Sequence, residues 1–416
     1  MNARAMSLVE LLIASVLMLI TIGGIATLMQ RAAGIATSQR GGIDLQQNRR
    51  GAEREITRSL LLAGRGGLPA GRALPKPAPP TPPPHRLPDG IALRVENNVG
   101  SGRRILPGVD NAPRVALGTD ILTVRAVTGS LYRLGKNALS RTSSTSVNGR
   151  LVVPRTAAQD LEDLEEALAK NKPLALVIGS AADADAYGVA ELDPAASQVQ
   201  SDQIVLAFVF YEPGNVNSEP GRPAQTYSQL GPEGLFPIEL FRQGAATVGI
   251  LRELRYYVRH QETSEVPVGE DGSDRLSRAE VFPGLERAAD DDSANLAQDI
   301  AYGVVDLQIS LGFDTPALGT LATGGSITSS ADGKNDDWLW NAPSEKENEA
   351  PWKDLSPWSL EEVEVSLLAR SPFPDRTQIA PPIDHLGDRP GTELNTDAAR
   401  RYRRSLTSWR IQLRNL

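Results

Sequence analysis

Met6-Ser-Leu-Val-Glu10 leads into Leu11–Met29, nineteen residues without a charged side chain, and this stretch decides the fold. As an α-helix with a rise of 1.5 Å per residue, the run is ~28 Å long, close to the ~30 Å hydrocarbon core of a bilayer. We therefore expect a transmembrane helix over residues 6–30. Glu10 is unusual there, because a carboxylate in hydrocarbon costs at least ~2.5–3.5 kcal/mol on insertion scales. A positive partner from another molecule would offset that cost; the alternative is a Glu10 that lies at the cytoplasmic interface without a partner.

The flanks of the apolar run distinguish it from an ordinary signal peptide. The run is longer than the apolar region of a signal peptide, and no small-residue cleavage site follows it. Arg4 precedes the run and Arg31 follows it, so the positive-inside rule decides the orientation only weakly. We expect the segment to remain in the membrane.

Residues 31–64 are expected to continue the helix beyond the membrane as an amphipathic segment that packs on the chain's own soluble body. Gly41-Gly42 is a candidate interruption of this helix, and Gly64 with Gly66-Gly67 is its candidate end. The apolar stripe has spacings of four, four and three residues, typical of one helical face, and consists of Ala52, Ile56, Leu60 and Ala63.

The remaining chain is expected to form a β-rich body after a proline-rich spacer. Residues 65–90 hold nine prolines, which favour an extended linker or exposed loop. In residues 91–416 apolar and polar residues alternate, as in antiparallel strands with one buried face, and long polar loops intervene. The expected strands are Ile121–Val127, Leu174–Ile178, Ile204–Tyr211, Leu251–His260, Leu307–Phe313, Val363–Leu367 and Trp409–Leu413.

These patterns together predict an α+β fold in which one long N-terminal helix packs on a mostly antiparallel sheet. Short helices are also expected at Leu161–Lys170 and Leu296–Tyr302. The body is long enough to divide into two lobes, and we place the division near residue 235.

Charge and composition argue against several classes of function. The net charge is −8, but residues 1–70 carry +4 and the remainder −12, which argues against a nucleic-acid-binding body. The chain has no cysteine, which excludes thiol catalysis, cysteine metal sites and disulfides. His85, His260 and His385 share no metal-ligand spacing, and no nucleophile elbow or nucleotide-binding loop occurs. We therefore expect no enzymatic activity, no cofactor and no nucleic-acid partner.

Two loop features leave alternatives open. One acidic loop is either a solvated loop, which we favour, or a calcium site, because hard cations bind clustered oxygen atoms. Four of the five tryptophans fall in residues 338–358, where they either anchor a long loop on the sheet, which we favour, or form an exposed contact surface. The candidate calcium ligands are Asp332, Asn335, Asp336 and Asp337, in an order unlike that of an EF-hand loop.

The N-terminal residues Ala5-Met6-Ser7-Leu8-Val9-Glu10 resemble the class III leader junction of type IV pilins and type II secretion pseudopilins. The resemblance implies a leader peptide of residues 1–5, cleavage by prepilin peptidase between Ala5 and Met6, and N-methylation of Met6. Glu10 then occupies the fifth mature position, where the family carries a glutamate. Ala5 stands where the family usually has glycine, and Met6 where it usually has phenylalanine.

Weaker matches extend along most of the chain and, in their order, resemble minor pilins of the PilW type. The proline tract, the loop 315–358 and the lack of cysteine depart from the pattern of many pilins. The matching segments are Leu45–Gly64, Gly118–Arg125, Arg255–Arg259, Val305–Ile309, Val363–Ser371 and Trp409–Asn415.

The resemblance implies a minor pilin that spans the inner membrane once, with its body in the periplasm. An assembly platform in that membrane would add it, with other minor and major pilins, to a type IV pilus. A bulky body favours a place near the tip, where the protein would prime assembly or contact an adhesin. Glu10 would offset the positive α-amine of a neighbouring subunit and fix the axial register. The alternatives are a minor pseudopilin of type II secretion, a membrane-tethered periplasmic enzyme or carbohydrate-binding protein, and a plain signal-anchored protein that retains Met1.

Overall fold

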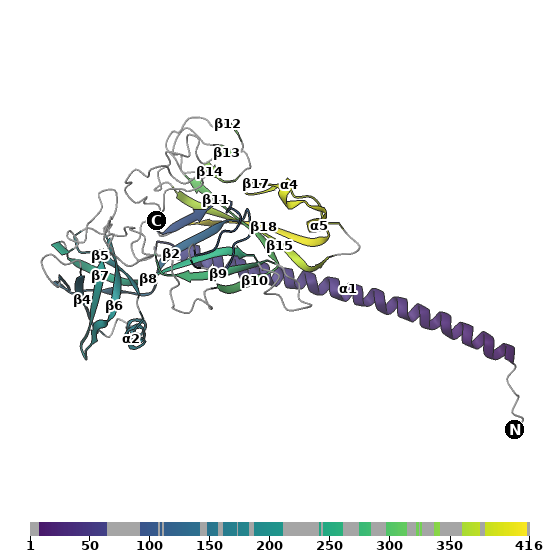
Figure 1. Cartoon of the computed structure of the whole chain (residues 1–416), viewed down its shortest axis with the longest axis horizontal. Coiled ribbons are helices and arrows are strands. Elements are labelled where there is room, and N and C mark those ends of the chain that lie inside the picture. Colours follow the sequence, from purple (N-terminus) through teal and green to yellow (C-terminus); the bar gives the residue numbers. More distant parts are fainter. Residues whose placement is uncertain are drawn as a thin grey trace, which may run out of the picture.

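The computed structural model combines one long helix with a β-rich body, so the expected α+β class is confirmed (Figure 1). Every strand pairing in the described residues is antiparallel. The structure describes residues 8–64, 92–106, 109, 112–141, 148–156, 161–172, 174–182, 187–210, 241–242, 244–260, 274–283, 297–313, 322–323, 325–326, 337–341, 360–374 and 379–413.

Helix α1 runs without interruption from Leu8 to Leu62, a length of 55 residues. It passes through Gly41-Gly42, so the expected interruption there is wrong. Glycine weakens a helix by ~1 kcal/mol relative to alanine but still donates and accepts the helical hydrogen bonds. The expected end is confirmed: Gly64 has φ of 76°, the left-handed conformation that terminates helices, and its N–H donates to the carbonyl of Arg125 at 3.4 Å.

A ten-stranded sheet forms the larger part of the body. Its main path is β1-β2-β8-β5-β6-β7-β4-β3, and β9 and β10 extend from β8. The strands are β1 (Leu93–Glu96), β2 (Ile121–Arg133), β3 (Leu139–Arg141), β4 (Asn148–Pro154), β5 (Ala175–Ser180), β6 (Tyr187–Val199), β7 (Gln203–Phe210), β8 (Ala245–Arg259), β9 (Arg275–Val281) and β10 (Ala297–Tyr302).

A four-stranded sheet lies beside it in the order β14-β11-β15-β18. Its strands are β11 (Val304–Phe313), β14 (Asp337–Leu339), β15 (Leu360–Pro374) and β18 (Tyr402–Gln412). The smaller elements are α2 (Glu162–Ala169), the hairpins β12 (Ala322–Thr323) with β13 (Gly325–Ser326) and β16 (His385–Leu386) with β17 (Arg389–Pro390), and the short helices α4 (Gly391–Leu394) and α5 (Asp397–Arg400).

Each expected strand is present, most of them longer than expected, and the helix expected at Leu161–Lys170 is confirmed as α2. The helix expected at Leu296–Tyr302 is wrong, because residues 297–302 form strand β10. β10 pairs with β9, and a bulge between Asp299 and Ala301 breaks the simple alternation. The short apolar pattern fitted either state, and pairing with the preceding strand β9 decided between them.

Strands β8 and β11 are buried on both faces, whereas alternation predicted one buried face. Arg255 of β8 is 4% exposed and Gln308 of β11 is 1% exposed. Both polar side chains have partners: Arg255 Nη1 donates to the carbonyl of Ile105 at 2.9 Å, and Gln308 Nε2 donates to the carbonyl of Gly118 at 2.8 Å. Loops from distant parts of the chain cover these faces, which local sequence does not reveal.

Two large hydrophobic clusters and two smaller ones lie in the described part of the body. The first joins α1 with both sheets, and the second lies among β4–β7 and α2. β2 and β8 contribute to both clusters, so the chain leaves the first cluster along β2 and returns to it along β8. Residue 235, where a division was expected, lies outside the described residues, as does the proline-rich segment 65–90.

Two of the four clustered tryptophans are buried. Trp338 is 5% exposed and Trp340 is 1% exposed, and Trp340 belongs to the first hydrophobic cluster. The prediction that these tryptophans anchor a loop on the sheet is confirmed for both. Trp352 and Trp358 lie outside the described residues.

Candidate membrane anchor and its socket

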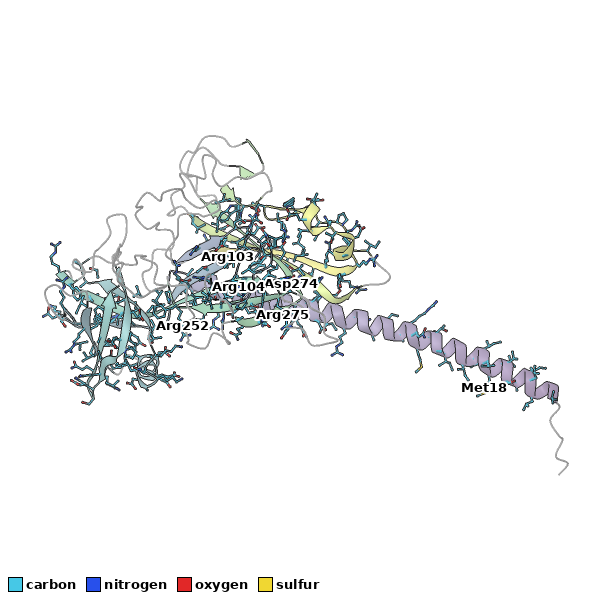
Figure 2. All side chains as sticks on the ribbon, in the orientation of Figure 1. Met18, Arg103, Arg104, Arg252, Asp274 and Arg275 are labelled. Atoms are coloured by element: carbon cyan, nitrogen blue, oxygen red, sulfur yellow. The ribbon has the colours of Figure 1, made fainter. Side chains whose placement is uncertain are left out.

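The N-terminal part of α1 projects away from the body and is covered by exposed apolar side chains (Figure 1). Leu19 is 69% exposed and Met29 is 70% exposed. Figure 2 shows Met18 on this projecting part, far from Arg275 of β9 in the body. In the part of the chain that the structure describes, α1 is the one helix long and apolar enough to span a membrane. A continuous apolar surface of this size needs a cover of lipid or of other apolar helices.

The hydroxyl groups within the apolar segment are satisfied inside the helix. Ser15 Oγ donates to the carbonyl of Leu12 at 2.9 Å, and Thr21 Oγ1 donates to the carbonyl of Leu17 at 2.8 Å. Thr27 Oγ1 makes the same type of bond to the carbonyl of Gly23 at 2.9 Å. Because these hydroxyls have acceptors on their own helix, they enter hydrocarbon without the cost of an unpaired polar group.

The C-terminal part of α1 is held in the body by its apolar stripe, as the periodicity predicted. The four stripe residues pack into the first hydrophobic cluster with side chains from both sheets. Burying side chains of the size of isoleucine and leucine stabilises the docked helix by ~1.5–3 kcal/mol each. We call this cluster the socket; its α1 residues are Ala52, Ile56, Leu60 and Ala63, all 0–2% exposed.

A polar contact set reinforces one side of the socket. Tyr256 Oη lies 2.6 Å from Ser59 Oγ and donates to Glu55 Oε1 at 3.2 Å. Glu55 also forms an ion pair with Arg278, with Nη1 at 2.5 Å from Oε1. Burial raises the pKa of Tyr256 to about 12, the Ser59 bond lowers it, and the Glu55 charge raises it further. Tyr256 therefore remains a neutral hydrogen-bond donor to the helix.

A second polar contact set joins α1 to the closing strand and to β10. Trp409 Nε1 donates to Thr57 Oγ1 at 3.1 Å, and Arg49 Nη1 donates to Thr407 Oγ1 at 3.2 Å. Asn48 Nδ2 donates to the carbonyl of Tyr302 at 3.2 Å. These partners are more than 250 residues away in sequence, so sequence analysis did not find the pairs. The alternation around Trp409 indicated only that its side chain faces inward.

Most of the residues expected to form the leader junction and the calcium site lie outside the described residues. Ala5 and Met6 lie outside the described residues, and Glu10 lies in α1, where its backbone alone is described. Asp337 begins β14 and pairs with Phe313. The other candidate ligands, Asp332, Asn335 and Asp336, lie outside the described residues, as does His85.

Within the described ranges, no group of three or more His, Asp or Glu residues could hold a metal ion. His260 Nδ1 lies 3.2 Å from Asp274 Oδ1 at the end of β8. His385 is exposed in β16. The two described histidines therefore lie on separate elements, without a shared site.

Buried aspartates between the two sheets form a cluster that sequence analysis missed. Asp120 accepts the N–H of Asn98 at 2.8 Å and of Ile309 at 2.7 Å. Burial raises the pKa of Asp120, and the charge of Asp388 raises it further. The short bonds tie the β1–β2 connection to β11, so the cluster fixes the two sheets to each other.

Asp306 belongs to the same cluster and pairs with a residue of the β16–β17 hairpin. Its Oδ2 lies 2.8 Å from Nη1 of Arg389. Burial raises the pKa of Asp306 to about 6, although the charge of Arg389 and a hydrogen bond from Gln308 lower it. This carboxyl group therefore changes its protonation near pH 6.

No protein-family model, curated protein or solved structure matches the chain. The structural features that bear on function are the projecting apolar half of α1 and the socket that holds the other half.

Proposed function

We propose that the chain is a minor pilin, anchored in a membrane by the N-terminal half of α1 and assembled with other pilins into a type IV pilus. The observation that carries the proposal is the continuity of α1: one 55-residue helix is apolar and exposed in its first half and docked in the socket in its second half. This arrangement suits a subunit that moves between a bilayer and a bundle of helices, because either environment covers the same apolar surface.

The leader junction supplies the second support. Cleavage after Ala5 creates a positive α-amine on Met6, near the start of the apolar segment. A carboxylate from Glu10 of a neighbouring subunit stabilises that amine in a low-dielectric setting, and the pairing fixes the axial position of the subunits. When α1 moves into the fibre, the body moves with it, because the apolar stripe and the two polar contact sets keep α1 bound to the body.

The proposal is tested by mass spectrometry of the N-terminus of the membrane-extracted protein. The expected N-terminal residue is Met6 carrying an N-methyl group. An intact residue 1 on the mature protein contradicts the proposal and supports a plain signal anchor.

A glutamate variant tests the assembly step. We expect Glu10→Ala to insert into the membrane as the native chain does but to be impaired in incorporation into the fibre, measured as its amount in sheared pilus fractions. Normal incorporation would refute the role of Glu10. Comparison of type IV pilus fractions with type II secretion complexes identifies which assembly takes up the native chain.

A further inference from the structure

The face of α1 opposite the socket carries a row of exposed basic residues. Arg50, Arg54 and Arg58 recur every four residues, so they lie one above the other along the outer face of the docked helix. We call these three residues the arginine ridge. The row continues at both ends with exposed side chains and contains no carboxylate; its other members are Arg40, Ile43, Gln47 and Leu61.

The arginine ridge lacks a partner among the described residues. No ion pair or hydrogen bond in the described ranges involves the side chains of Arg50, Arg54 or Arg58, whereas Arg49, on the inner side of the same helix, donates to Thr407. Like charges four residues apart repel each other and destabilise a helix. The burial of the apolar stripe in the socket stabilises the helix despite this repulsion between the arginines. A negatively charged partner would neutralise the arginines and remove the repulsion.

The position of the ridge argues against a lipid headgroup as that partner. Arg50 follows Met29 by 21 residues, or ~31 Å along a helix with a rise of 1.5 Å per residue. If the membrane segment ends near Met29, this distance is several times the ~8 Å Debye length at physiological ionic strength. A protein partner that lies beside α1 can contact the arginines directly, so screening over this distance does not weaken the interaction.

The surroundings of the ridge favour an amphipathic helix. Ile43 is 55% exposed and Leu61 is 39% exposed, and these apolar side chains flank the arginines on the same face. At Gly51, beside the ridge, an added Cβ would meet no atom within 4 Å, so another helix has room to approach closely. Helices recognised in this way present apolar anchors at helical spacing.

We propose that the arginine ridge docks an acidic amphipathic helix of a partner protein, with carboxylates at four-residue spacing and apolar residues at both ends. The inference rests on the proposed function, in which α1 packs beside helices of other subunits, and it specifies their charge. Salt weakens this contact, because the ridge is exposed.

Peptide binding to the full-length chain in detergent micelles tests the proposal. The probe is a fluorescent helical peptide with glutamate at every fourth position and leucine at both ends; the control peptide has the same composition with its glutamates distributed around the helix. We expect the ordered peptide to bind at least tenfold more tightly, with an affinity that falls as salt rises. Equal binding of the two peptides overturns the proposal.

Two charge-reversal variants locate the binding surface. Arg50→Glu with Arg54→Glu and Arg58→Glu is expected to lower the affinity for the ordered peptide at least tenfold. The matched control, Lys136→Glu with Arg150→Glu and Arg401→Glu, reverses three exposed charges elsewhere and is expected to bind as the native chain does. Equal affinity of the ridge variant and the native chain overturns the proposal, as does an equal loss in the control.

Arg54→Glu separates docking from a structural role. The new glutamate lies four residues from Arg50 and from Arg58, so it replaces two repulsive pairs with two attractive ones. We expect its melting temperature to stay level or rise while its affinity for the ordered peptide falls. A fall in both, or in neither, contradicts the proposal.

Two further measurements separate this proposal from others. If ridge reversal abolishes binding to anionic phosphatidylglycerol nanodiscs but leaves peptide binding unchanged, a membrane surface replaces the protein partner and the proposal fails. The N-terminal mass is independent of the ridge: an intact residue 1 together with ordered-peptide binding refutes the pilin proposal and leaves the docking surface standing.

Discussion

Substitution of Ile56 by alanine tests whether the socket holds α1 on the body. Ile56 is 0% exposed and lies in the cluster that joins α1 with both sheets. Alanine removes roughly three methylene equivalents, which corresponds to ~2.4 kcal/mol of lost burial. The cavity adds to this loss, so we expect the free energy of unfolding to fall by ~2–5 kcal/mol.

Denaturant unfolding of the detergent-solubilised chain measures the loss, and tryptophan fluorescence is the readout. Trp409 is a suitable reporter because its indole donates to Thr57 of α1 at 3.1 Å. Leu61→Ala is the matched control: this side chain is 39% exposed on the outer face of the same helix, and we expect a change below ~0.5 kcal/mol. Equal, small losses in both variants would refute the assignment of the stripe as the buried face.

The buried polar groups give two further predictions. Asp306 has a folded-state pKa of about 6, so between pH ~4 and pH ~6 the native state keeps a proton that the unfolded chain has released. Its contribution therefore lowers stability as pH rises through this window, by ~3 kcal/mol in all. Asp306→Asn should flatten the pH dependence in denaturant unfolding at pH 4.5, 5.5 and 7; an unchanged slope contradicts the assignment. Tyr256→Phe removes the hydrogen bonds to Ser59 and Glu55 and should cost ~1–2 kcal/mol in the same assay. Ultraviolet titration should show equal tyrosine ionisation in the native chain and in Tyr256→Phe well below pH 12; one additional ionisation in the native chain there would contradict the buried, bonded phenol.

Features set by local periodicity could be predicted from the sequence. Four apolar residues at helical spacing identified the docked face of α1 before any partner was known, because the helical period alone places them together. Gly64 identified the end of the helix for a similar reason: few other residues adopt φ of 76° without strain.

Features set by partners outside the local sequence pattern could not be predicted. Residues 297–302 form a strand because β9 offers a pairing edge, and their own pattern fitted a helix equally well. The Asp120 site depends on the N–H of Ile309, 189 residues away, so no local spacing could reveal it. The contacts of Ser59 and Thr57 with Tyr256 and Trp409 are of the same kind.

Because α1 is long and is docked only near its C-terminal end, a small rotation at the socket displaces its N-terminal end by a large distance. Among the side chains of α1 that the structure describes, Leu45 is the first buried one, and Leu8 lies ~56 Å before it at 1.5 Å per residue. A rotation of about 5° at the socket therefore moves the start of the helix by ~5 Å, roughly one helical turn. Contacts on two sides of the docked segment, to Tyr256 and to Trp409, restrict that rotation. The contacts of α1 with side chains in the body thus determine how precisely the position of its N-terminal end is fixed.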